Sequence, residues 1–432
     1  MTTPRSLTST PARRRLAGVA SWALVAALAL SGCGSSDGTS DASSTSSGTT
    51  SSSTSTSTST VADAASTAAT SASTDATTTQ QTVTDTAAAA EAFLATLSDE
   101  QREQLLYDYD DETKTTSWSN FPVTFVERAG LNLADLTEEQ QAAALEVLAA
   151  LLSDEGYATV SGVIGGDQYL ADNSSSTEDS LGQYYIAFFG DPSETEAWEV
   201  QFGGHHLGIN ATLDGTAGTL TFAPTHLGVQ PAVYTNEDGE EVEPFDGIYT
   251  DAFAFYDSLT DAQLAALTSG EVSMCAPGDT CDFATGSGLQ GSDLTDAQRQ
   301  LLLDLIANWA GLADQETTAA ALAEIEATLD DTYVSWSGAT EYDMSTGDGI
   351  NFSISGPDVY IAFQAQQGSA GADVDGVTTS GWGHVHTIYR DPSNDYAGSV
   401  TQQAATGMGA AGGGPGEGGA PPDADGTPPS AG

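Results

Sequence analysis

The sequence predicts an α+β fold, in which capped helices pack on a mainly antiparallel sheet. Two observations lead to this class. A motif that begins helices occurs four times along the chain, and the longer helical segments are followed by groups of short, β-type segments. Residues 87–403 have a globular composition and are numerous enough for one large domain or two small ones.

Each of the four helix starts has Leu, then Ser or Thr, then one or two acidic residues, and Gln three positions after the Ser or Thr. The motifs are residues 97–101, 136–140, 259–263 and 294–298. The hydroxyl can accept a hydrogen bond from the first helical turn, and the Gln side chain can return to the cap. Acidic residues are favourable there because the helix dipole is positive at its N-terminus. We expect a helix to begin at each motif.

Two sets of β-type segments suggest a duplication of two halves. The sequence Tyr-Ile-Ala-Phe occurs at residues 185–188 and again at residues 360–363, and a Gly-His step follows each copy. Strands built from few residue types also share such identities by chance. The sequence leaves both explanations open. The expected strands are residues 184–189, 198–202, 219–222, 333–336, 351–355, 359–364 and 384–389.

Residues 1–32 have the features of a lipoprotein signal peptide, with arginines and no acidic residue before an apolar run. The run is shorter than the about 20 apolar residues that span a membrane. It ends at Leu-Ser-Gly-Cys, residues 30–33, which resembles the lipobox of bacterial lipoproteins. We expect Cys33 to carry diacylglycerol and palmitate and to anchor the chain at the extracytoplasmic face of the cell membrane. The alternative is an ordinary secreted protein in which the cysteine occurs by chance. The sequence also leaves open whether export uses the general or the twin-arginine route.

Two further segments are predicted to be disordered. Residues 33–86 begin with the lipidated cysteine and continue as a Ser/Thr-rich stalk, and residues 404–432 form a Gly/Pro-rich tail. Such compositions bury too little apolar surface to offset chain entropy.

The charge of the chain excludes some partners. Removal of the signal peptide would leave five basic and 61 acidic residues, a formal charge of −56 against −52 for the full chain. Nucleic acid and anionic headgroups are therefore poor partners. Cations, or a small-molecule ligand, are compatible with this surface.

Cys275 and Cys281 are the cysteines that remain after Cys33. In an oxidising compartment we expect them to form a disulfide that closes a short loop and contributes about 2 kcal/mol. A zinc site at this pair is disfavoured because no histidine is close in sequence.

The five histidines all lie in or beside the β-type segments, at positions 205, 206, 226, 384 and 386. His384 and His386 are two residues apart, so in a strand they point to the same face, whereas adjacent His205 and His206 point to opposite faces. We expect His384, His386 and either His205 or His206 to bind zinc, copper or iron, with His226 or Asp391 completing the shell. The alternative is structural histidines bonded to backbone carbonyls, since no complete metal motif such as HExxH is present.

Residues 390–396 read as a turn that contains one of the few basic residues of the mature chain. Arg390, with Asp391, is a candidate for binding an anionic group of a substrate. A structural ion pair is the alternative for Arg390. Phosphoryl transfer is not supported, because the chain has no Walker loop.

Three motifs together resemble a bacterial family, the domain of unknown function 3500. They are residues 118–122, 204–207 and 384–396, and the resemblance extends from about Tyr107 to Tyr396. It implies an exported protein of similar architecture, with no assigned activity to transfer. The Cys275 loop and the long stalk depart from the family pattern.

These observations give two functional hypotheses. In the first, an exported, membrane-anchored lipoprotein binds a transition metal through a histidine cluster and acts on a small extracellular substrate. In the second, the histidines are structural and the domain is a non-enzymatic binding module of the cell envelope, whose acidic surface recruits cations. The sequence leaves open whether the protein is an enzyme.

Overall fold

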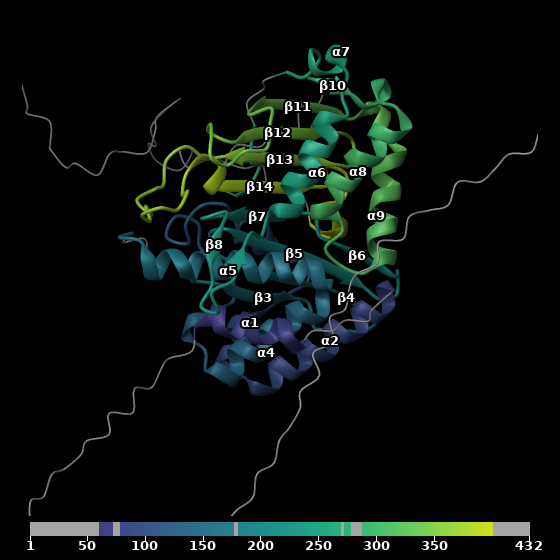
Figure 1. Ribbon diagram of the computed structural model, residues 1–432. Helices are drawn as coiled ribbons and strands as arrows, with labels where there is room; N and C mark the ends of the chain where they lie inside the picture. The colour runs from purple at the N-terminus through teal and green to yellow at the C-terminus, as the bar shows by residue number, and fades with distance from the viewer. Residues whose placement is uncertain (1–59, 72–77, 177–179, 269–271, 278–286, 401–432) are drawn as a thin grey trace, which may run out of the picture. The chain divides into compact units, whose positions relative to one another are not determined.

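A computed structural model describes residues 60–71, 78–176, 180–268, 272–277 and 287–400 (Figure 1). Within them, nine α-helices and a twelve-stranded, mainly antiparallel sheet confirm the α+β class. The signal peptide, Cys33, Cys281 and the C-terminal tail lie outside the described residues. No helix in the described part of the chain is long and apolar enough to cross a membrane.

The main sheet runs through ten strands in one continuous path. In spatial order these are β1 (Leu106–Tyr107), β3 (Tyr185–Phe189), β4 (Ala197–Gly203), β5 (Leu207–Asp214), β7 (Thr225–Val229), β14 (Val385–Arg390), β13 (Tyr360–Ala365), β12 (Ile350–Ser355), β11 (Tyr333–Gly338) and β10 (Leu289–Gln290). Off this path, β2 (Leu131–Asn132) pairs with β3, and β6 (Thr219–Thr221) pairs with β5. A separate ribbon joins β8 (Tyr234–Thr235) to β9 (Glu241–Val242).

Helices α5, α6 and α8 cross in front of the strands in Figure 1, whereas the short α7 lies beyond the edge formed by β10. The described helices are α1 (Val61–Ser71), α2 (Thr79–Thr96), α3 (Asp99–Leu105), α4 (Glu138–Leu151), α5 (Asp154–Asn173), α6 (Asp246–Asp257), α7 (Asp261–Leu264), α8 (Asp296–Ala310) and α9 (Gln315–Ala327). Their apolar side chains share one core with Phe202, Ile209 and Ile361. On the other face of the sheet, Ile388 packs with Trp118 and Met274, which come from connecting segments.

All four predicted capping boxes are present. Ser98, Thr137, Thr260 and Thr295 begin α3, α4, α7 and α8, and each bonds reciprocally with the Gln three residues later. The Gln side chains also bond in pairs, Gln101 with Gln140 and Gln263 with Gln298. The same contact between two helix starts therefore occurs twice in the molecule.

The two halves of the chain repeat the same order of elements and meet in the centre of the sheet. Strands β2, β3, β4, β5 and β7 follow one another in the first half, as β10 to β14 do in the second, and β7 pairs with β14. One row of paired residues crosses all of these strands: Leu131, Ile186, Phe202, Ile209, Thr225, Tyr389, Ile361, Ile354, Val334 and Leu289.

This order corrects the alignment expected from short identities. Residues 185–188 lie in β3, but residues 360–363 lie in β13, whose counterpart in the first half is β5. The two Gly-His steps are not equivalent either, because one follows β4 and the other precedes β14. Identities between strands of similar composition did not identify equivalent strands.

The predicted stalk ends earlier than residue 86. Helix α1 and the start of α2 belong to the folded region, since Val61, Ala65 and Val83 are buried in its core. Small Ala and Thr side chains recur at helical spacing there, so a segment of low complexity still forms a buried face. The Thr82 hydroxyl also donates to the Asp314 carboxylate at 2.7 Å.

Candidate metal site at the junction of the two halves

The five histidines converge where the two halves of the sheet meet. His205 and His206 lie in the connection between β4 and β5, and His226 lies in β7. His386 lies in β14, which pairs with β7, and His384 directly precedes that strand. All five are buried, the most exposed being His205 at 6%. The fold thus brings together ligand candidates from both halves of the chain.

The imidazole rings form one contiguous cluster. The rings of His205 and His206 are stacked, with centroids 4.3 Å apart. The ring of His386 lies 5.4 Å from that of His205, 5.2 Å from that of His206 and 5.1 Å from that of His384. His386 is therefore in the middle of the cluster.

Three of these residues have the geometry of a metal site. His205, His206 and His386 each offer one ring nitrogen, and these nitrogens lie within 4.8 Å of one another. The same three residues each have a buried nitrogen without a hydrogen-bond partner: Nδ1 of His205, Nε2 of His206 and Nδ1 of His386. An unsatisfied buried polar atom is costly and uncommon in folded proteins. A bound cation would satisfy all three.

His205 and His206 were expected on opposite faces, and this prediction is wrong. Alternation of faces applies to strands, and both residues lie in a turn between strands, where the backbone places their rings side by side. Both are in the three-residue set, while His384 stands beside it with its Nε2 at 3.1 Å from Nε2 of His386.

Asp167 and Tyr184 complete the cluster and were not predicted. Oδ1 of Asp167 lies 2.5 Å from Nδ1 of His206, and the Tyr184 hydroxyl donates to Oδ2 at 2.7 Å. Both side chains are buried. Asp167 is one of 61 acidic residues, so composition gave no reason to choose it. Its position between Ile164 and Leu170 on the apolar stripe of α5 was the available signal.

His226 fits the structural alternative. Its Nδ1 lies 2.7 Å from the carbonyl oxygen of Thr387, and its Nε2 lies 3.0 Å from that of His205. Both ring nitrogens thus face backbone acceptors, and the neutral ring donates to one of them. His226 therefore bonds to the backbone beside the site.

Burial controls the protonation of the cluster. It lowers the pKa of His206 to about 3, that of His384 to about 3 and that of His226 to about 4. It also lowers the pKa of His205 and His386 well below the usual value, and neighbouring histidines add to the effect. Neutral imidazole is the form that binds a metal, so at neutral pH the cluster is ready for a cation.

The comparison with known families covers the folded region except for α1. The family described as "Protein of unknown function (DUF3500)" matches residues 79–398, which begin with the first residue of α2. The chain belongs to the DUF3500 family. No curated protein and no solved structure matches it. The resemblance inferred from the sequence motifs is confirmed.

In this DUF3500 domain, Arg390 is not placed to bind a substrate. Its guanidinium is completely buried and donates to Oδ2 of Asp395 from Nε at 2.9 Å and from Nη2 at 2.6 Å, and it also donates to the Cys275 carbonyl. The Asp391 carboxylate accepts from the backbone N–H groups of Ser393 and Asn394 and so closes the predicted turn. The ion pair and the turn replace the expected substrate-binding role of both residues.

The DUF3500 domain forms a disulfide at Cys275. Its predicted partner, Cys281, lies outside the described residues.

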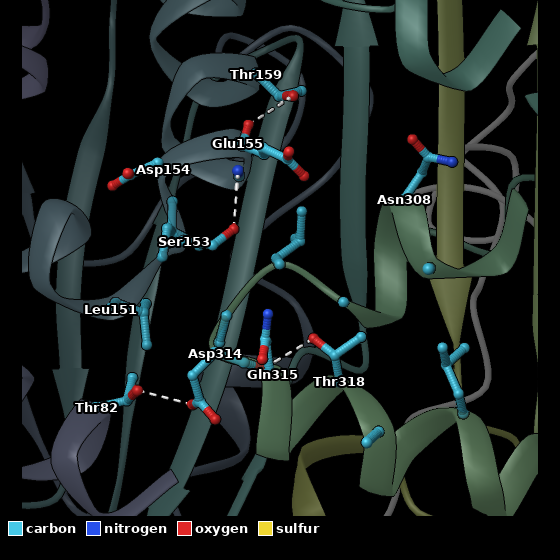
Figure 2. Close-up of a pocket in the computed structure, with 18 of the residues that line it drawn as sticks. Thr82, Leu151, Ser153, Asp154, Glu155, Thr159, Asn308, Asp314, Gln315 and Thr318 are labelled. Carbon is cyan, nitrogen blue, oxygen red and sulfur yellow. Dashed lines mark hydrogen bonds between the residues drawn. The ribbon is translucent and has the colours of Figure 1, made fainter. Parts of the chain in front are cut away.

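Two cavities lie outside the histidine cluster. One of about 870 Å³ lies between the α4–α5 and α8–α9 turns, where Ser153, Asp154 and Glu155 are close to Asp314 and Gln315 (Figure 2). The other, of about 400 Å³, is lined by Tyr169, Tyr234 and Gly383 among others. Gly383 directly precedes His384 in the chain, but no histidine is among the residues that line this cavity.

Proposed function

We propose that the DUF3500 domain of this protein binds one transition-metal ion through His205, His206 and His386. The observation that supports this most strongly is the coincidence of three buried, neutral imidazoles, each with an unpartnered nitrogen, whose ligand atoms lie within 4.8 Å of one another. Three imidazoles suit zinc, copper or iron and leave a fourth position for His384, water or a substrate.

Binding of one ion would require the three rings to move closer together. Imidazole nitrogens on one tetrahedral zinc ion are roughly 3.3 Å apart, because each bond is about 2.0–2.1 Å long. The ligand nitrogens of His205, His206 and His386 lie within 4.8 Å of one another.

We also propose that the protein works outside the cytoplasm as a lipoprotein, and that its substrate or ligand is small. The signal-peptide pattern, Cys33 at the end of the apolar run and the acidic mature chain support the location. The cavity of about 400 Å³ beside Gly383 has the size of a small-molecule site. A bound metal would supply Lewis acidity or an activated water to such a ligand.

The metal proposal is tested by elemental analysis of the full chain, purified without a His tag or chelator. We expect about one transition-metal ion per chain, lost in the variant His206→Gln/His386→Gln, and a melting temperature that chelation lowers only in the unaltered protein. Metal-free protein that cannot be reloaded, and whose melting is insensitive to chelation, would instead favour structural histidines in a binding module.

The location is tested separately. Bacteria that make the full chain are fed an alkyne fatty acid, and we expect the unaltered protein to be labelled and Cys33→Ser to be unlabelled and released from the membrane fraction. Equal labelling or equal release of the two proteins would contradict lipidation of Cys33.

A further inference from the structure

We infer that Asp167 and Tyr184 are positioning residues that fix the tautomer of His206, so that Nε2 of this ring is offered to the metal. The inference rests on the metal site proposed above. It adds two residues, and it assigns them a function that can be measured in the metal-free protein.

The hydrogen bonds define which nitrogen of His206 carries the proton. Oδ2 of Asp167 accepts from the Tyr184 hydroxyl at 2.7 Å, and Oδ1 lies 2.5 Å from Nδ1 of His206. A carboxylate accepts hydrogen bonds, so Nδ1 must donate and the proton lies there. The lone pair is then on Nε2, which is buried and has no partner.

The fold delivers Asp167 to this position by a close approach of helix α5. The residues before it are Gly165 and Gly166, and a Cβ atom at Gly165 would lie only 2.3 Å from the Tyr234 hydroxyl oxygen. A Cβ atom at Gly166 would lie 3.5 Å from the Gln230 carbonyl oxygen. A side chain at position 165 would therefore have to displace the Tyr234 hydroxyl, which packs against this turn of α5, whereas the distance at position 166 is an ordinary contact.

Tyr184 is held just as firmly. Its ring stacks on Phe202, with centroids 5.7 Å apart and an interplanar angle of 9°. The side chain is completely buried. The hydroxyl is therefore fixed toward Asp167. Its hydrogen bond to one carboxylate oxygen prevents the carboxylate from turning away from His206.

His226 is an internal comparison that favours positioning over simple core packing. Both ring nitrogens of His226 lie within hydrogen-bond distance of backbone carbonyl oxygens, and the neutral ring donates to one of them. His206 has a strong acceptor on one side and no partner on the other. A carboxylate behind a histidine whose other nitrogen is free is the common arrangement around metal-binding histidines.

The experiment combines nitrogen NMR with metal titration of the ¹⁵N-labelled full chain. In the metal-free protein we expect His206 to be protonated at Nδ1. We expect Asp167→Asn to populate the Nε2–H tautomer and to weaken zinc binding about 10–100-fold in competition with a chromophoric chelator. Tyr184→Phe should change the tautomer population and the zinc affinity in the same direction, by a smaller factor. The cobalt-loaded protein should show an altered visible spectrum in both variants.

Two variants are matched controls. Asp172→Asn makes the same change at an exposed position of α5, and Tyr157→Phe removes a buried hydroxyl of α5 that bonds to the Ala65 carbonyl. Neither should change the tautomer or the affinity. If Asp167→Asn does not fold, Tyr184→Phe provides the test.

The possible results separate this inference from the metal proposal. Unchanged tautomer and affinity in a folded Asp167→Asn or Tyr184→Phe variant would overturn the positioning role. If the unaltered protein binds no metal, the metal proposal fails. In that case, loss of the Nδ1–H tautomer in the variants would still establish that Asp167 sets the tautomer of His206.

Discussion

Five imidazole rings share the buried centre of the sheet, and none of them can gain a proton there without a large penalty. Burial lowers the pKa of all five histidines below the usual value. The same burial raises the pKa of Asp167 to about 6. The stability of the metal-free protein is therefore coupled to pH at this one site.

We expect the free energy of unfolding of the metal-free protein to decrease as the pH falls below about 6.5, the usual histidine pKa. The unfolded chain binds protons there that the folded histidines exclude, at a cost of about 2 kcal/mol for each histidine at about pH 5. Asp167 acts in the opposite direction, because stability due to its raised pKa is lost as the pH rises through about 6. One carboxyl does not offset five histidines.

Urea denaturation at several pH values measures this effect. The variant His206→Gln/His386→Gln has two fewer histidines and should show a shallower decrease. A free energy of unfolding that stays constant from neutral pH to about pH 5 would contradict the buried, neutral state of the cluster.

The only lysine of the chain makes a second prediction at the residue scale. Lys114 Nζ lies 3.2 Å from Oε2 of Glu199, and both side chains are completely buried. Lys114→Met would leave the carboxylate without its cation, so we expect a loss of about 3–5 kcal/mol in urea denaturation. Lys114→Met/Glu199→Leu should recover most of it.

A surface ion pair is the control for that experiment. Arg299 pairs with Asp330, whose side chain is 67% exposed. Arg299→Met should cost at most about 1 kcal/mol, because solvent screens the pair. Equal losses at Lys114 and Arg299 would show that burial does not determine the cost.

Residue chemistry made the histidines predictable and Asp167 unpredictable. Histidine occurs five times in the chain, so its grouping is visible in the sequence, whereas Asp167 is one of 61 acidic residues. A structural ion pair of Arg390 was an open alternative, and only the structure showed that its partner is Asp395 and that the guanidinium is buried. The residues that bind a metal depend on which turns meet in the fold, and a local sequence pattern does not show this.

Among the secondary-structure elements, helix starts are specified most clearly by the sequence. The Gln298 side chain accepts from the Thr295 N–H, donates to the Ser258 carbonyl and bonds with Gln263. We expect Gln298→Ala to lower the free energy of unfolding by about 0.5–1.5 kcal/mol, since partly buried partners lose their hydrogen bonds.

The matched control is Gln300→Ala, on the same helix. The Gln300 side chain donates to Asp304 at an exposed position, so its removal should have little effect. If both variants have the same stability in urea denaturation, the capping box does not contribute as the geometry suggests.

The accuracy of the predictions differed between helices and strands for a physical reason. A capping box is formed by residues within one turn, so all four were predictable. The equivalence of strands depends on their position in the sheet. The match of residues 185–188 to residues 360–363 was therefore wrong, while the α+β class was predictable.

At the scale of the whole molecule, the candidate site joins the two halves. His205 and His206 come from the first half and His386 from the second. A metal bound to all three should stabilise the interface between the halves against unfolding, because an ion that binds only the folded state stabilises that state.

A cleaved form of the protein tests this coupling. The exposed turn at Asp238 and Gly239 connects β8 to β9 and can accept a protease site. After cleavage of the folded protein, we expect the two fragments to separate at a higher urea concentration with zinc than with chelator, as measured by size-exclusion chromatography. Separation at the same concentration would contradict a shared site.

The central position of β14 has a consequence for biosynthesis. Among the strands that the structure describes, β14 is the last to be synthesised, yet it lies between β7 and β13. A nascent chain interrupted before Val385 would display two unpaired sheet edges, which are templates for aggregation. An incomplete chain would therefore expose both edges at the same time, and only the synthesis of β14 would cover them together.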